Sequence, residues 1–121
     1  LYQTAQSLVG RVDGIYVPTD NTIVSSIQSV IKVTNANNLP LIVADNSSVK
    51  AGALATLGID YYKLGAQTGK MAEEILNGAD PGQMGIERIE EADLIINKQA
   101  AEKMEIDLPQ SLIDQAKKVI K

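Results

Sequence analysis

The sequence predicts an α/β domain built on a parallel sheet with flanking helices. Two short apolar runs, Ile15–Val17 and Leu41–Asp45, lack the polar alternation of a half-exposed strand, and the second ends in a carboxylate. Such runs are typical of strands that are covered on both faces. A helix-length amphipathic segment separates them, as a parallel crossover requires. A chain of 121 residues is long enough for one small domain with its own core.

Composition excludes several functional classes. The chain has no Cys, so it can form neither a disulfide nor a thiolate metal site. It also has no His, the commonest general base and transition-metal ligand. The net charge of −4 argues against a nucleic-acid partner, which needs clustered Lys and Arg. No apolar run approaches the length of a membrane span, and no cofactor motif follows a strand.

A polar segment follows the first predicted strand. Ile15–Val17 must end at Pro18, because proline donates no ladder hydrogen bond. Three polar residues, Thr19, Asp20 and Asn21, then precede a helix that begins near Thr22. Ligands of open α/β sheets bind outside the carboxyl ends of the strands, near helix N-termini. The segment is therefore a candidate binding site.

Asp20 and Asp45 both close a predicted strand, so neighbouring parallel strands would place them on one edge of the sheet. Two carboxylates there could bind a cation, clamp an amino group or share a proton. The alternative is that both only cap helices or form turns. Small hydrogen-bonding residues accompany them and, with Gly52, indicate a polar pocket: Thr19, Asn21, Ser47 and Ser48.

Apolar periodicity and breaker residues predict the remaining elements. They are a helix ending at Gly10, a helix from Thr22 to about Asn37, a third apolar run at Ala53–Ile59, a helix from about Tyr62 to Asn77, strands at Ile86–Ile89 and Leu94–Ile96, a helix over Lys98–Met104 capped by Asn97, and a last helix opened by Pro109 or Ser111. That helix should carry Val119 and Ile120 on its apolar face, with Lys117, Lys118 and Lys121 near its end. Tyr16 is expected in the core or at an interface between lobes.

Four stretches match a known family in order and spacing: Asp13–Asn21, Leu39–Asp45, Gly52–Tyr62 and Leu64–Gly78. They resemble the bacterial ABC-transporter substrate-binding lipoproteins that include tryptophan and other amino-acid binders. The resemblance implies a partial lobe of a type I periplasmic-binding-protein fold. Residues 1–121 would form one α/β domain, most of the second lobe. Residues from about 53 to 85 would form the crossover and a helix that packs on a missing first lobe.

The resemblance also implies a function. Thr19, Asp20, Asn21 and Asp45 match positions that face the cleft, and Gly52 and Ala53 match the third hinge region; together they form the expected ligand-binding set. The expected ligand is an amino acid, with an aromatic one such as tryptophan first. The expected partners are ABC permease subunits, outside the cytoplasm, with a lipid anchor on the full-length parent. Neither catalysis nor a cofactor is expected, and the uncovered stripe Leu64, Met71, Ile75 and Leu76 should make the fragment self-associate.

Two other classes remain open from the residues alone. One is a signalling receiver domain, which shares this length, this acidity and a strand ending in Asp45. A receiver needs an acidic pair after its first strand and a Lys after its last, and neither stands in place. The other is a small metal-dependent enzyme that uses Asp20 and Asp45. A thermal-shift screen of amino acids, divalent metals and acyl phosphate separates these classes.

Overall fold

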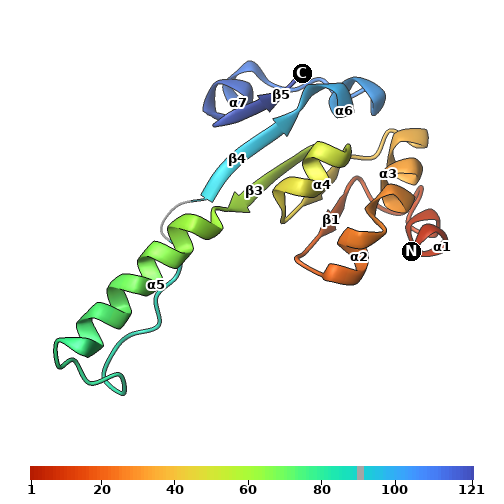
Figure 1. Cartoon of the computed structure of the whole chain (residues 1–121). Coiled ribbons are helices and arrows are strands. Elements are labelled where there is room, and N and C mark those ends of the chain that lie inside the picture. The colour runs from red at the N-terminus through yellow and green to blue at the C-terminus, as the bar shows by residue number, and fades with distance from the viewer. Residues whose placement is uncertain (90–91) are drawn as a thin grey trace. The chain divides into compact units, whose positions relative to one another are not determined.

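The computed structural model describes residues 1–89 and 92–121, and the chain forms two units. The first unit contains Leu1–Gly58 and Asp93–Lys121, and the second contains Ile59–Ala92. A five-stranded sheet with the order β1-β2-β3-β4-β5 organises the first unit (Figure 1). The strands are β1 Ile15–Val17, β2 Leu41–Val43, β3 Ala55–Ile59, β4 Ala92–Asn97 and β5 Lys118–Ile120.

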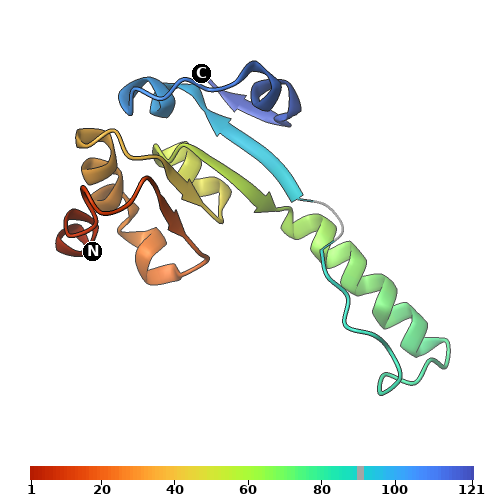
Figure 2. The ribbon, with the colours of Figure 1, turned by 180° about the vertical axis from the view of Figure 1, so that it is seen from behind.

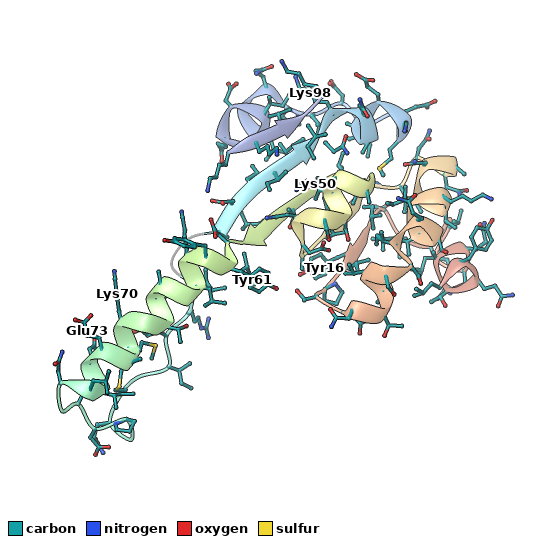
Figure 3. The ribbon with its side chains drawn as sticks, viewed as in Figure 1. Tyr16, Lys50, Tyr61, Lys70, Glu73 and Lys98 are labelled. Carbon is teal, nitrogen blue, oxygen red and sulfur yellow. The ribbon has the colours of Figure 1, made fainter. Side chains whose placement is uncertain are left out.

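The sheet is mainly parallel. β1 pairs in parallel with β2, β2 with β3, and β4 with β5. The N–H of Asn97, at the end of β4, donates to the carbonyl of Leu54, just before β3, at 2.8 Å. These neighbouring strands therefore run in opposite directions, as Figure 2 also shows. The predicted α/β class with a parallel sheet is confirmed.

Helices connect the strands, and most lie close to their predicted positions. In the first unit they are α1 Tyr2–Gln6, α2 Asn21–Ser25, α3 Ile27–Ala36, α4 Asn46–Ala51, α6 Lys98–Lys103 and α7 Gln110–Gln115. The second unit contains α5 Tyr61–Leu76. Asn97 caps α6 as predicted, because its side-chain oxygen accepts the N–H of Ala100 at 3.0 Å.

The core of the first unit lies where the strands meet these helices. Among its fully enclosed side chains are Leu41, Val43, Val49, Ile96 and Met104. Strand side chains alternate between the two faces of a sheet. Val17 is therefore buried, whereas its neighbour Tyr16 points to the opposite face and is 64% exposed. The expectation that Tyr16 lies in the core of this domain is wrong.

Two predicted helices differ from those in the structure, one by an interruption and one by an earlier end. The helix predicted from Thr22 to Asn37 breaks at Ser26, between α2 and α3. The Ser25 hydroxyl bonds to the carbonyl of Thr22 at 2.9 Å, and such local bonds compete with a regular helix. The last helix stops at Gln115, after which Lys118–Ile120 pairs with β4. Because Val119 and Ile120 are β-branched, they suit an edge strand better than the predicted helical face. Lys118 is the first residue of that strand, and Lys117 and Lys121 flank it.

In the second unit, the chain returns beside α5 as an extended segment. Gln67 on α5 donates to the Glu87 carboxylate and to the carbonyl of Arg88, each at 2.9 Å. The strand predicted at Ile86–Ile89 is wrong, since the segment pairs with no strand in the described part of the chain, and Ile86 is 99% exposed. Across residues 1–89 and 92–121, no helix has the length and apolarity needed to cross a bilayer.

Candidate ligand-binding site at the ends of β1 and β2

Asp20 and Asp45 follow adjacent parallel strands at the same edge of the sheet. Val17 and Val43, the last residues of β1 and β2, are register partners, and the N–H of Ala44 donates to the carbonyl of Val17 at 3.0 Å. Each Asp lies only a few residues beyond its strand. The prediction that the two carboxylates share one edge is confirmed. We call this edge, defined by Asp20 and Asp45, the carboxylate rim.

Each carboxylate caps the helix that follows it. Asp20 has extended backbone geometry, and its Oδ1 accepts the N–H of Ile23 at 2.9 Å, which caps α2. Asp45 caps α4 in the same way, through the N–H of Ser48 at 2.9 Å. The capping interpretation is therefore correct for both residues.

Capping uses only one of the two oxygens of each carboxylate, Oδ1. All the hydrogen bonds recorded for Asp20 and Asp45 within the described residues end on Oδ1. An ionised carboxylate can accept through both oxygens. The Oδ2 atoms of the rim are therefore available to a donor outside the chain, so the same residues can cap helices and bind a ligand.

Asp45 is held in its charged form by its neighbours. Partial burial opposes ionisation, but hydrogen bonds from Ser47 and Ser48 outweigh it, so the pKa of Asp45 lies below its ordinary value. The Ser47 hydroxyl bonds directly to Oδ1. An acceptor that is charged at neutral pH at a strand end favours a cationic or hydrogen-bond-donating ligand.

The other predicted site residues divide into two groups. Thr19 and Asn21 flank Asp20 and are exposed, so they share the rim. Gly52 and Ala53 lie at the amino end of β3, away from the carboxyl ends of β1 and β2. Gly52 ends α4 with a φ of 127°, and Ala53 is fully buried. The fold does not bring Gly52 and Ala53 to the rim, and their expected hinge role stays a prediction.

Asn46 is a further feature of this region, and its sequence context did not predict its contact with β3. A Cβ built on Gly58 of β3 would lie 2.2 Å from the Asn46 side-chain oxygen, so the amide packs against bare backbone. That oxygen is buried and has no hydrogen-bond partner among the described atoms. The contact between Asn46 at the start of α4 and Gly58 on β3 carries no sequence signal, because only the β2–β3 pairing brings the two residues together. No group of three or more acidic residues arranged to hold a metal occurs in residues 1–89 and 92–121.

In open, mainly parallel α/β sheets, ligands bind outside the carboxyl ends of the strands, where the carboxylate rim lies in this chain. The family of proteins described as "ABC transporter substrate binding protein" matches residues 1–120. The chain belongs to that family, and the resemblance inferred from its motifs is confirmed.

Individual relatives agree with this assignment. A tyrosine-binding protein of Clostridioides difficile strain R20291 is 48% identical over 96 residues, which cover 79% of this chain and 28% of the relative. A conserved domain protein from Vibrio cholerae is 36% identical with a TM-score of 0.80, over 98% of this chain and 40% of that one. An ABC domain in complex with L-Trp from Streptococcus pneumonia is 33% identical with a TM-score of 0.79, over the same shares. The chain thus spans less than half the length of each of these relatives.

Proposed function

We propose that this chain is part of the solute-binding component of an ABC importer and that its rim binds the ammonium group of an amino acid. One observation carries the proposal: Asp20 and Asp45 follow adjacent parallel strands, and neither Oδ2 has a hydrogen-bond partner among residues 1–89 and 92–121. A carboxylate that accepts from an ammonium makes a charge-assisted hydrogen bond, about twice as strong as a neutral one. Two such acceptors side by side select a group with several N–H donors.

The remaining rim residues suit the other end of an amino acid. Thr19 and Asn21 offer a hydroxyl and an amide beside Asp20, and both can donate to a ligand carboxylate. Support for an aromatic side chain comes from the relatives, one a tyrosine-binding protein and another an L-Trp complex. We therefore expect an aromatic L-amino acid, with tryptophan and tyrosine as the first candidates and no chemical turnover.

The second unit supports a two-lobe arrangement. α5 has no buried residue, and Tyr62 and Leu76 on it are 86% and 87% exposed. Apolar side chains left exposed at this level commonly mark an interaction surface. We infer that residues from about 53 to 85 cross to a first lobe, which α5 contacts and which supplies the other side of the ligand cleft. Closure of the two lobes would then present a surface to the ABC permease.

The same assignment implies a location. Solute-binding components of importers act outside the cytoplasm, and we expect a lipid anchor on the longer protein. Metabolic labelling of the longer protein with a fatty acid, followed by fractionation, tests this part separately. Recovery of an unlabelled protein from the cytosol would contradict it.

Calorimetric titration of the longer protein with L-amino acids tests the proposed function directly. The informative set is L-tryptophan, tryptamine, which lacks the carboxylate, and indole-3-propionate, which lacks the ammonium. Loss of the ammonium should abolish binding, because Asp20 and Asp45 would then face an apolar atom. Equal affinity for tryptophan and indole-3-propionate would refute the role of the rim. Stabilisation by a divalent metal or acyl phosphate alone would favour the metal-enzyme or receiver alternatives.

A further inference from the structure

A cavity lies in the first unit, lined by residues from α4, β4 and the chain around the start of β5, and four of its six lining residues are charged. Its volume is about 340 Å³, and its lining consists of Asn46, Lys50, Asp93, Ile95, Lys117 and Lys118. Neither Asp20 nor Asp45 lines it. The cavity is therefore distinct from the carboxylate rim, although Asn46 directly follows Asp45 in the chain.

The charges of this cavity are unbalanced. Lys117 pairs with Asp93, so one cation and the cavity's carboxylate neutralise each other. The side-chain ammonium groups of Lys50 and Lys118 make no ion pair or hydrogen bond within the described chain. Two unpaired ammonium groups thus line one cavity on a chain whose net charge is −4. Their positive potential attracts anions and is relieved when an anion binds.

The Asn46 amide adds a hydrogen-bond donor. Its oxygen is buried against Gly58 without a partner, and its nitrogen makes no hydrogen bond to the described residues. An amide nitrogen carries two donors, and these can bond to an acceptor that enters the cavity. Because Gly58 has no side chain, the amide oxygen can stay against the backbone. The remaining polar end of Asn46 is then left to the cavity.

We propose that Asn46, Lys50 and Lys118 form a binding site for a small oxyanion, either a phosphate or a carboxylate group. The ammonium groups supply charge and the amide supplies a directed donor, which is the combination that oxyanion recognition uses. A cavity of about 340 Å³ has room for such a group together with bound waters. This site does not depend on the amino-acid site at the rim.

Titration of the 121-residue chain with inorganic phosphate, acetate and chloride at constant ionic strength tests the proposal. NMR signals of the Asn46 side-chain amide and of the lysine ammonium groups report the binding. Phosphate and acetate should produce saturable shifts at Asn46, Lys50 and Lys118. The oxyanion with the higher affinity identifies the ligand class. Chloride shifts of the same size and pattern would overturn the proposal.

Variants make the test specific. Lys50→Gln and Lys118→Gln should each weaken oxyanion affinity roughly two- to fivefold, the effect of one exposed charge pair. Lys32→Gln removes an exposed charge on α3, outside the cavity, and should leave affinity unchanged. All these side chains are exposed, so melting temperatures should stay the same. An equal loss of affinity in Lys32→Gln, or no loss in the other two variants, would overturn the proposal.

Discussion

The side-chain oxygen of Asn46 occupies the space that a side chain at residue 58 would need, since a Cβ on Gly58 would lie 2.2 Å from it. Asn46 opens α4 and Gly58 lies on β3, so the contact fixes the start of the helix against the sheet. Gly58→Ala should destabilise the chain by about 1 kcal/mol, the low end of the usual cost of overpacking, because only the end of the Asn46 side chain has to move. Urea unfolding measures this change.

The matched control is Gly65→Ala on α5, where nothing lies within 4 Å of an added Cβ. Alanine favours a helix over glycine by up to about 1 kcal/mol, so this variant should be neutral or more stable. A loss of stability in Gly65→Ala equal to that in Gly58→Ala would show that the Asn46 contact is not the cause.

Asp20→Asn should weaken ligand binding far more than folding in the longer protein. Removing the charge leaves the ligand ammonium without its partner, at a cost on the order of 2–5 kcal/mol in affinity. Asparagine caps a helix nearly as well as aspartate, so the unfolding free energy should change by only about a few tenths of a kcal/mol. Calorimetric titration and a melting curve on the same variant compare the two effects. Asp107→Asn, at an exposed site away from the rim, serves as the control. Unchanged affinity would show that Asp20 only caps α2 and does not bind the ligand.

The lowered pKa of Asp45 makes a small part of the stability depend on pH. A carboxyl whose pKa is lower in the folded chain binds fewer protons there than in the unfolded chain. Its stabilising contribution is therefore complete above the ordinary pKa of about 4 and is lost as the pH falls through the folded value. Ser47→Ala removes one of the bonds that lower the pKa, so the pKa should rise. NMR titration of the Asp45 carboxyl carbon, with Asp107 as the control, measures the change; an unmoved titration curve would contradict the role of Ser47.

The Asn97 side chain hydrogen-bonds to two helices, α4 and α6, and substitutions can separate these two interactions. Its side chain accepts from Ala100 in α6 and donates to the carbonyl of Val49 in α4 at 2.8 Å, and the residue is only 4% exposed. Asn97→Asp keeps the cap but loses the donor. It should destabilise by about 1–3 kcal/mol or more, because the Val49 carbonyl is left facing an acceptor. Asn97→Ala loses both bonds and is a second test. Wild-type urea midpoints in both variants would rule out this role.

The 121-residue chain should self-associate through α5. Ile75 and Leu76 are 42% and 87% exposed, and a helix that presents such residues to water gains free energy by covering them. Light scattering should therefore give a mass that rises with concentration. Leu76→Gln should reduce the rise, whereas the polar exchange Lys70→Gln on the same helix should not. A concentration-independent monomer mass for the unaltered chain would contradict this prediction.

The sequence predicted elements wherever local chemistry and tertiary environment agree. Ile15–Val17 matches β1 residue for residue because the apolar run, the proline after it and the capping Asp20 all favour one boundary. The same agreement placed α6 after Asn97. Both aspartates of the rim could be located because parallel strands bring their carboxyl ends to one edge.

The errors arose where partners distant in sequence decide the structure. Val119 and Ile120 fit a helical stripe by spacing, but β4 offers a free edge that their β-branched side chains prefer. Ile86–Ile89 has strand character without a described partner strand to pair with. The packing of Asn46 on Gly58 depends on the register of two strands, which no local pattern encodes.

The adjacency of β3 and β4 has a consequence for how this domain can be engineered. The chain leaves the first unit along β3 and re-enters it along the antiparallel neighbour β4, with Leu54 bonded to Asn97. Gly58 and Asp93, the two residues at the break, therefore belong to adjacent strands. A short Asn-Gly turn between them would close β3 and β4 into a hairpin. The segment Ile59–Ala92 is thus an insertion between two neighbouring antiparallel strands. It can be deleted or replaced without changing the order or the direction of the strands in the sheet.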